Sequence, residues 1–593
     1  MEKFIQLELN MSSLAIEGSL HGLQQAPIIA VVTLAKIPEL VELKIIKIID
    51  ELLGLDVALL DKLNQPLIKK LPVWVTQIHR INKIPISEVY KSSSKSKTKN
   101  YESFWIILPR THPAASSIAL KWIISVINSI YYTKGENGIL KKYILDLKKS
   151  LQPFAPEGLN TYQILDAAYR LDIPIRKITS SIHMLGIGEN SRWFESTITD
   201  RTPHLGAKAA GNKRQAAEIL RQAGLPGGYN KIVNSEEQAV AAAQLLGFPV
   251  VVKPADKEQG VGVMADLSDD AIVRSAYHAA RLVSNQILVE RHVHGFTHRL
   301  TVIHGHVVRV SKRIAGGVVG DGRHSIDELV SKLQHDPEYQ KRAQSIGKQL
   351  ISLDDEALSL LRQYGLQPSH VLAQGQYLKL RRRDNVNAGA TSQMCELTKV
   401  HPDNIQLAID AAAALKLDLA GVDLIIENIE YSWREVDALI CEVNAKPQIV
   451  APEDPLFYDV ILSKIMAGKF RIPLHLVIIP ANDALRHGLI QKWKAHASSN
   501  AISDTSGVRV NGIIVSSNFE NGYEAALAMF ARTNVREAVC LMTLADIKQM
   551  GFPSNKWTSV YVEHKELFDP NEQSIMNIAL SLLAPGTQIQ QLH

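Results

Sequence analysis

The sequence has few cysteines and no long uncharged apolar run. Only three of its 593 residues are cysteines, Cys395, Cys441 and Cys540, and no two of them form a Cys-x-x-Cys pair. This spacing argues against a disulfide framework and against a zinc ribbon, and it predicts a reducing, cytoplasmic environment. No stretch of about 20 apolar residues is free of charge, so we expect no membrane span. The first ten residues include two acidic ones and no long apolar core, unlike a signal peptide.

The sequence also lacks a strong excess of charge of either sign. Its net charge of +5 is small for its length, so we expect no nucleic-acid partner. Hydrophobic residues make up 46% of the chain and charged residues 21%, a balance typical of globular proteins. A chain of this length is too long for one core and predicts three or four domains.

The patterning predicts an α/β and α+β multidomain protein. Residues 1–160 read as an α+β unit, with a strand in ESFWIILP and a helix in AASSIALKWIISVINSIYY. Within it, Lys91–Asn100 reads as a solvated loop, with a nucleic-acid or anionic-lipid contact as the second interpretation. Helices, strands and antiparallel hairpins alternate over residues 161–470, and residues 471–593 form a last, short α/β unit.

Two lysines and a glycine pair suit the phosphates of a nucleotide. Lys213 opens a helix in AAGNKRQAAEIL, and Lys253 ends an apolar strand in VVVKP. Either lysine can reach a phosphate, although a lone lysine at such a place is more often on the surface. Gly260 and Gly262 permit a tight loop whose backbone N–H groups cover phosphates, or else a simple hairpin corner.

A strand that ends at a hinge follows the glycine pair. ILVERHVHG places Glu290 near the end of this strand, where its backbone and carboxylate suit adenine and ribose. The alternative interpretation is an edge strand with a charged end.

Hard oxygen donors occur late in the same region. LAGVDLII places Asp423 on an apolar strand, and LICEVNAKP places Glu442 and Asn444 on another. The alternation of side chains along a strand directs Glu442 and Asn444 to the same face. A lone carboxylate on a strand usually lies at an exposed edge, but this combination predicts a magnesium site.

Three arginines lie between the lysines and these carboxylates. Arg299, Arg313 and Arg381 are all candidates to neutralise the charge that develops when a phosphoryl group is transferred to a carboxylate. For Arg381, in LKLRRRDNVNAGA, a solvated turn is an equally good interpretation.

The order of these motifs resembles that of the ATP-grasp ligases. Residues from about 160 to 470 resemble in particular the ATP-grasp domain of the cyanophycin synthetase family, in LVERHVHGFTHRLTVIHGHVV, VVGDGRHSIDELV and CEVNAKP. The resemblance implies ATP and Mg²⁺ as cofactors, and phosphorylation of a peptide carboxylate followed by attack of an amine. It implies ATP contacts for Lys213, Lys253, Gly260, Gly262 and Glu290, magnesium ligation by Asp423, Glu442 and Asn444, and catalytic roles for Lys253, Arg299 and Arg313.

The last unit resembles a shortened Mur-ligase-like domain. In the family such a domain carries a GTNGKTT phosphate loop, and Ile479, Asp483 and Ala484 stand here at its glycine, lysine and threonine positions. Because an aspartate would repel phosphate, we expect a dead second ATP site and a structural or oligomerising remnant. The GHxxEH motif that some relatives use for hydrolysis is not visible in the first 160 residues, so we expect no hydrolase activity there.

This layout resembles the short type 2 cyanophycin synthetases, which implies polymerisation of β-aspartyl-arginine dipeptides. The implied partners are ATP, a peptide or polymer acceptor and an amino-acid or dipeptide donor, in a homo-oligomer. Lys257 and Gln259 depart from the family's glycine loop, as NAKPQIVAP does from its substrate edge. These departures favour, as an alternative, an amide ligase with a different product. The degenerate flanking domains favour another alternative, a non-catalytic partner of a full-length synthetase. A biotin-carboxylase-like or purine-pathway ATP-grasp enzyme is the last alternative.

Overall fold

The structure is a computed structural model that describes most of the chain. The described residues are 4–9, 16–55, 66–87, 91–133, 137–257, 262–346, 349–382, 389–449, 456–481, 483–496, 500–563 and 565–591. They form two compact units, one from Met1–Thr199 with Asp454–His593 and the other from Asp200–Glu453. The division into three domains at residues 160 and 470 stays a prediction.

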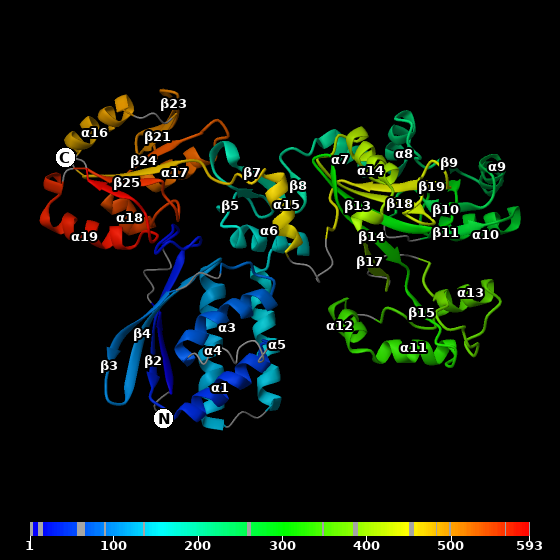
Figure 1. Cartoon of the computed structure of the whole chain (residues 1–593), viewed down its shortest axis with the longest axis horizontal. Coiled ribbons are helices and arrows are strands. Elements are labelled where there is room, and N and C mark those ends of the chain that lie inside the picture. The colour runs from blue at the N-terminus through cyan, green and yellow to red at the C-terminus, as the bar shows by residue number, and fades with distance from the viewer. Residues whose placement is uncertain are drawn as a thin grey trace. The chain divides into compact units, whose positions relative to one another are not determined.

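The unit Asp200–Glu453 begins with a four-stranded antiparallel sheet covered by two helices (Figure 1). Its strand order is β11–β10–β12–β9, with β9 (Asn230–Val233), β10 (Val250–Pro254), β11 (Met264–Leu267) and β12 (Ile287–Arg291). Helices α9 (Glu236–Leu246) and α10 (Asp270–Arg281) are capped by the side chains of Ser235 and Asp269. Small alanines on both helices and valines on the strands share one buried core, so the helices lie close to the sheet.

A five-stranded antiparallel sheet follows, in the order β17–β14–β13–β18–β19. Its strands are β13 (Phe296–Ile303), β14 (His306–Ile314), β17 (Thr391–Cys395), β18 (Leu419–Ile426) and β19 (Ala438–Asn444). Helix α14 (Pro402–Ala414) packs on one face, where Leu300, Val422 and Val443 share a core with Leu407 and Ala411. Helices α7 (His204–Ala210) and α8 (Lys213–Gln222) contact β19.

A small subdomain is inserted between β14 and β17. It consists of the hairpin-like pair β15 (Gly317–Val319) and β16 (Tyr377–Lys379) with α11 (Ile326–His335), α12 (Pro337–Ile346) and α13 (Asp355–Gln363). Arg381 is buried here, and its guanidinium donates to the Asp354 carboxylate at 3.0 and 2.8 Å and to the Leu350 carbonyl at 3.1 Å. Both interpretations of Arg381 were wrong: the arginine is neither in a solvated turn nor beside Asp423, because the insertion uses it to fix its own helices.

The N-terminal part of the other unit is a sheet with helices on one side (Figure 1). The order β1–β2–β4–β3 joins β1 (Ile5–Leu9), β2 (Pro27–Ala35), β3 (Lys91–Lys97) and β4 (Tyr101–Pro109). Its helices are α1 (Glu39–Leu52), α3 (Leu67–Ile81), α4 (Pro113–Thr133) and α5 (Asn137–Leu151). The loop predicted for Lys91–Asn100 was wrong for Lys91–Lys97, because its backbone pairs with β4 while exposed serine and lysine side chains keep the edge polar.

Helix α4 is the one described helix that is long and apolar enough to cross a membrane by length and composition. Half of its window Pro113–Tyr132 is buried inside the structure. Ala119, Leu120 and Ile123 are completely buried in the core of the N-terminal part.

The rest of this unit is a small sheet and a larger one. The small sheet is β5 (Ile175–Lys177), β6 (His183–Leu185), β7 (Arg192–Glu195) and β8 (Ile198–Thr199), beside α6 (Leu159–Arg170) and α15 (Phe457–Ile465). The seven-stranded sheet has the order β23–β22–β21–β24–β20–β25–β26 and a parallel centre. Its strands are β20 (Leu474–Ile479), β21 (Ala501–Asp504), β22 (Gly507–Val510), β23 (Ile513–Ser517), β24 (Ala538–Thr543), β25 (Ser559–Val562) and β26 (Ile589–Gln591). Its helices are α16 (Asp483–His496), α17 (Gly522–Phe530), α18 (Leu544–Met550) and α19 (Pro570–Ser581).

Candidate active site

The five-stranded sheet has an apolar face on α14 and a polar face opposite. Asp423 on β18 is paired in register with Arg299 on β13 and with Glu442 on β19. Asn444 is paired with Gly421, two residues from Asp423, so Glu442 and Asn444 share the face of Asp423. The register therefore gathers two carboxylates and an amide on one side of the sheet.

A β-bulge in β19 makes this arrangement possible. Asp423 pairs with Glu442 and Leu424 pairs with Ile440, so Cys441 is the extra residue between them. Without the bulge, Ile440 and Glu442 would lie on the same face. With it, Ile440 joins the core on the α14 side while Glu442 lies on the polar face.

Asp423 is buried against two arginines. Its carboxylate accepts from Arg299 Nε and, at 2.7 Å, from Arg299 Nη2, and Arg313 Nη1 lies 3.5 Å away. Asp423 is 2% exposed and Arg299 is 9% exposed. Burial by itself lowers the pKa of Arg299, but the Asp423 carboxylate, together with Glu442 and Cys441, outweighs burial and holds that pKa above its usual value. The guanidinium therefore remains a cation in a place that water hardly reaches.

Gly421 leaves the space that the Arg299 side chain occupies. A Cβ atom at this position would lie 2.9 Å from Nη1 of Arg299 and 2.9 Å from Cβ of Pro447. Both distances are shorter than real contacts, so any larger residue would displace the guanidinium from Asp423. Neither alternation nor charge in the sequence singles out this glycine.

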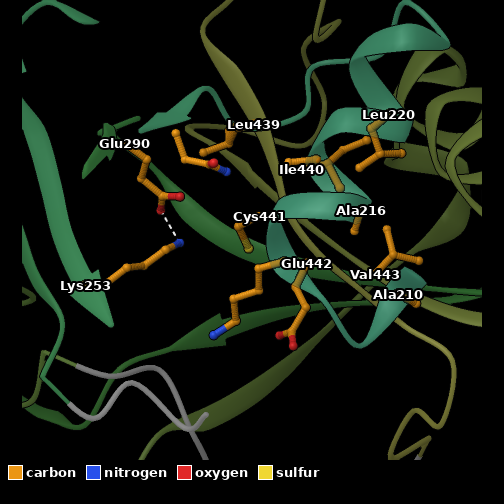
Figure 2. A pocket seen from close by; sticks show the side chains of 14 residues that line it. Ala210, Ala216, Leu220, Lys253, Glu290, Leu439, Ile440, Cys441, Glu442 and Val443 are labelled. Atoms are coloured by element: carbon orange, nitrogen blue, oxygen red, sulfur yellow. Dashed lines mark hydrogen bonds and ion pairs between the residues drawn. The ribbon is translucent and has the colours of Figure 1, made fainter. Parts of the chain in front are cut away.

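A pocket lies between α8, β10, β12 and β19, with about 420 Å³ of empty space including the part open to solvent. Its charged lining residues are Lys213, Lys253, Glu290 and Glu442, and Figure 2 shows Lys253 and Glu290 pointing toward each other. Apolar side chains form the rest, among them Ala216, Leu220 and Leu439. The pocket thus places cations and an apolar slot beside Glu442, which also belongs to the polar face.

Lys213 lies at the first position of α8. Asn212 caps the helix, since its side chain accepts from the backbone N–H of Gln215 at 3.1 Å. Lys213 Nζ donates to the Lys257 carbonyl at 3.0 Å, which links α8 to the segment after β10. The helix N-terminus and the ammonium group together favour an anion at this side of the pocket.

Of the two glycines Gly260 and Gly262, the structure describes only Gly262. Gly260, like Gln259, lies outside the described residues. Gly262 has φ of +70°, and a Cβ there would lie 2.7 Å from Cγ2 of Val283. The backbone at Gly262 therefore takes a conformation that favours glycine, for a steric reason that involves no ligand.

The metal-ligand set fits a hard cation. Two carboxylates and an amide supply the oxygen ligands that Mg²⁺ prefers. Asn444 could take part through its Oδ1 atom, whereas its Nδ2 atom, which is buried without a hydrogen-bond partner among the described residues, can only donate. Each Asp423 oxygen keeps acceptor capacity beyond its arginine hydrogen bonds.

The described part of the last unit joins β20 to α16 by a short connection. Ile479 is 2% exposed at the end of β20, and α16 begins at Asp483. The Asp483 and Ala484 side chains lie outside the described residues. The loss of the phosphate loop therefore stays a prediction.

Two family models match the unit that contains this site. Residues 207–311 match an ATP-grasp domain, and residues 375–461 match a RimK-like ATP-grasp domain. These matches bear out the predicted ATP-grasp fold for the middle of the chain. The class that the fold of this region indicates is that of the ATP-grasp domains.

Within this class, the chain is a homologue of cyanophycin synthetases. It is 33% identical to the cyanophycin synthetase of Trichormus variabilis over 337 residues, which is 56% of this chain and 36% of that protein. It is 30% identical to the one from Geminocystis herdmanii over 59% of this chain and 41% of that protein. The glutathione biosynthesis bifunctional protein GshAB of Clostridium perfringens is 27% identical over 48% of this chain and 37% of that protein. The chain therefore matches well under half the length of these relatives.

Among solved structures, a bifunctional glutathione synthetase from Pasteurella multocida aligns with a TM-score of 0.39 at 20% identity. The alignment covers 59% of this chain and 51% of that one. A similarity at this level adds nothing to the assignment.

Proposed function

We propose that this chain joins a peptide carboxylate to an amine at the expense of ATP, through an acyl phosphate. The observation that carries the proposal is that Glu442 lines one pocket with Lys213 and Lys253 and also shares the polar face of the sheet with Asp423, Asn444, Arg299 and Arg313. Positioning and charge neutralisation are what phosphoryl transfer requires of a protein.

In the proposed reaction a carboxylate oxygen of the acceptor attacks the γ-phosphorus of ATP and ADP leaves. The amine nitrogen of the donor then attacks the acyl carbon, phosphate leaves, and the nitrogen loses a proton. Lys213 and Lys253 bind phosphate oxygens, the apolar lining of the pocket receives the adenine, and Glu290 orients Lys253 and meets the ribose. Mg²⁺ bound by Asp423, Glu442 and Asn444 would neutralise charge on the phosphates.

The two arginines have different parts in this scheme. Arg299 is fixed in two hydrogen bonds to Asp423, so it orients that carboxylate. Arg313 approaches Asp423 only to 3.5 Å and is less buried, with 27% of its side chain exposed. It is therefore free to turn toward the transferring phosphoryl group.

For the substrate we propose β-aspartyl-arginine dipeptides, added one after another to a growing cyanophycin-like polymer. The relatives named cyanophycin synthetase support this choice. The GshAB relatives and the departures at Lys257 and Gln259 support the broader alternative, an amide ligase with a different amino-acid product. A non-catalytic partner subunit is the other alternative, which the intact set of site residues argues against.

Product analysis tests the proposal. The purified chain is supplied with Mg-ATP, a short peptide primer, and either β-aspartyl-arginine or a panel of amino acids and dipeptides. We expect ADP release together with mass increments of one dipeptide residue. Increments of another monomer would favour the alternative ligase. No ADP release and no mass increment with any member of the panel would contradict ligase activity.

A ligand-binding assay separates the enzyme from a non-catalytic subunit. Mg-ATP should raise the melting temperature of the unaltered chain by several degrees, since a ligand that binds only the folded state stabilises it. Glu442→Ala should lose this shift, and Glu435→Ala, in the exposed connection between β18 and β19, should keep it. An unaltered chain without any shift would favour the non-catalytic subunit.

A further inference from the structure

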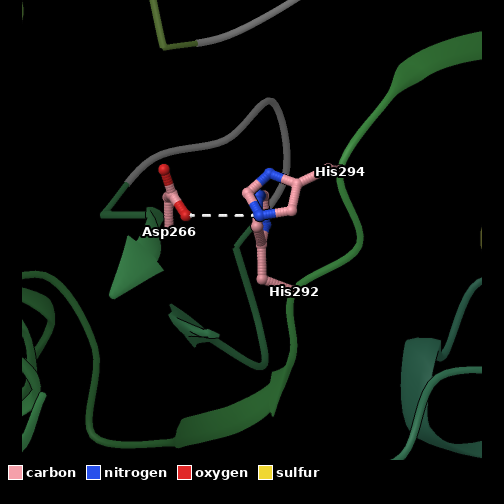
Figure 3. Close-up of side chains that lie close together, drawn as sticks. All are labelled: Asp266, His292 and His294. Atoms are coloured by element: carbon pink, nitrogen blue, oxygen red, sulfur yellow. Dashed lines mark ion pairs between the residues drawn. The ribbon is translucent and has the colours of Figure 1, made fainter. Parts of the chain in front are cut away.

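Three side chains that commonly ligate metals meet away from the pocket described above. Asp266 lies on β11, and His292 and His294 lie in the segment that joins β12 to β13. One oxygen of Asp266 and one ring nitrogen of each histidine all lie within 4.8 Å of one another. Nε2 of His294 is 3.8 Å from Oδ1 of Asp266, as the dashed line in Figure 3 marks.

The backbone at Asp266 is shaped in an unusual way. Val250 pairs with Leu267 and Val252 pairs with Met264, so one residue of β10 faces two of β11. Asp266 lies in this bulge with φ of +59°, a conformation that side chains other than glycine rarely adopt. A bulge redirects side chains, and this one leaves the Asp266 carboxylate beside the two imidazoles. The ATP site does not account for it, because Asp266 is not part of the pocket lining.

The two imidazoles are held at right angles. Their centroids are 4.9 Å apart with an interplanar angle of 89°, so they do not stack and their nitrogens are not forced into contact. The backbone N–H of His292 donates to the Pro249 carbonyl at 2.9 Å, which fixes the start of the segment to β10.

We propose that Asp266, His292 and His294 bind a divalent transition-metal ion, with Zn²⁺ as the representative. Two imidazole nitrogens and a carboxylate oxygen suit such ions, whereas Mg²⁺ and Ca²⁺ prefer oxygen ligands alone. Metal–ligand bonds of 2.0–2.2 Å in a tetrahedron place ligand atoms about 3.4 Å apart. The three atoms need only a small closing movement, and the exposed side chains of Asp266 and His294 leave the fourth position for water.

The bound ion would fasten two sheets of the same unit. Asp266 belongs to the four-stranded sheet, and His292 and His294 are two of the four residues that connect this sheet to the five-stranded sheet that carries Asp423. A metal ion bound to Asp266 and to the two histidines would restrict the motion of this connection close to Glu290 of β12. Its role is therefore structural, outside the chemistry of phosphoryl transfer.

The test measures Zn²⁺ affinity in the full chain, produced without a histidine tag and stripped of metal with a chelator. Competition with a chromophoric chelator gives the affinity, and the absorption of bound Co²⁺ reports the ligands. We expect one strong site per chain, weakened at least 10-fold in His294→Ala and in Asp266→Gly. Glycine at position 266 adopts the positive φ without strain, so this variant should fold at least as well as the unaltered chain.

Two control variants make the result specific. His278→Ala removes a histidine of α10 that lies 2.6 Å from Glu236 of α9. Among the described residues this pair has no third metal-binding side chain, so the variant should leave Zn²⁺ affinity unchanged. Glu442→Ala should also leave it unchanged, which separates this site from the magnesium site. The proposal is overturned if no strong site exists, or if His294→Ala and Asp266→Gly bind Zn²⁺ as tightly as His278→Ala does.

Discussion

The five-stranded sheet of the central unit and the seven-stranded sheet of the last unit both bury charged side chains, but they arrange them differently. In the five-stranded sheet, Asp423, Glu442 and Asn444 share one face and adjoin a pocket with two lysines. Glu442 on this face also lines that pocket, so it connects the polar face to the two lysines.

In the seven-stranded sheet, the acidic groups at the strand ends bind to their own neighbours. Asp504 pairs with Arg509 at 2.9 Å, and Asp546 accepts from the Thr543 N–H at 2.8 Å as part of a capping box. Glu563, completely buried, accepts from Nε1 of Trp493 at 2.8 Å. Each of these carboxylates stabilises a local turn or contact, so burial of charge alone does not make a site.

The largest effect we expect is on catalysis, from Glu442→Gln. The substitution keeps the shape of the side chain and removes the charge, so magnesium and the triphosphate lose a partner while the sheet remains. We expect ADP release to fall at least about 1,000-fold, with a change in the free energy of unfolding below about 1 kcal/mol. Rates of Mg-ATP turnover and chemical denaturation measure the two. Glu435→Gln is the control, and equal losses in both variants would contradict the assignment of Glu442.

Arg299→Met tests the buried ion pair between Arg299 and Asp423 on the polar face of the five-stranded sheet. The variant leaves Asp423 buried beside only Arg313, and breaking a buried pair costs about 3–5 kcal/mol of stability. Calorimetry should show a lower melting temperature of the unit Asp200–Glu453. Arg291→Met, which removes an exposed partner of Asp437, should change the free energy of unfolding by less than about 1 kcal/mol. A melting temperature that stays the same in Arg299→Met would show that the pair is not formed.

His79, on α3, provides a third case, a buried titratable group for which the described residues offer no charged partner. Burial lowers its pKa from 6.5 to about 4, while Nδ1–H donates to the Val75 carbonyl. Between these two values the unfolded chain binds a proton that the folded chain does not, so stability falls as the pH falls from 6.5 to 4. The loss should reach about 3 kcal/mol. In His79→Leu, the free energy of unfolding should depend less on pH between pH 6.5 and pH 4 than it does in the unaltered chain. An equal pH dependence in the two would contradict this account.

The smallest effect comes from Glu563→Gln in the seven-stranded sheet. The amide oxygen can still accept from Trp493, but Lys492, 3.6 Å from the other oxygen, loses its ionic partner. We expect a loss of about 1–2 kcal/mol in stability and unchanged ADP release. Denaturation and turnover assays on one preparation give both numbers. A fall in ADP release greater than the fall in folded protein would assign this sheet a part in catalysis.

The sequence was sufficient for the composition of the site and for much of its geometry. Asp423 on one apolar strand and Glu442 with Asn444 on another predicted a shared face, and the register agrees. Local pattern suffices here because each side chain lies on a regular strand. The helix at Lys213 and the strand ending near Lys253 follow from capping and apolar runs for the same reason.

Features that depend on packing could not be predicted. Regular alternation would place Ile440 and Glu442 on the same face, and the bulge at Cys441 breaks it and puts them on opposite faces. The strand Lys91–Lys97 has no apolar side chains and exists because β4 offers its backbone. Arg381 pairs with Asp354, 27 residues earlier, and only the folded insertion brings them together.

We propose that the site of Asp423 and Glu442 transfers a phosphoryl group to a carboxylate. The most direct measurement supplies a peptide acceptor whose terminal carboxylate carries ¹⁸O, together with Mg-ATP and β-aspartyl-arginine, and analyses the released phosphate by mass spectrometry. An acyl phosphate passes one carboxylate oxygen to phosphorus, so we predict one ¹⁸O atom in the phosphate released when the labelled carboxylate forms its amide bond, and none in the phosphate of later additions, which activate unlabelled carboxylates. Amide formation with phosphate free of ¹⁸O would contradict the account.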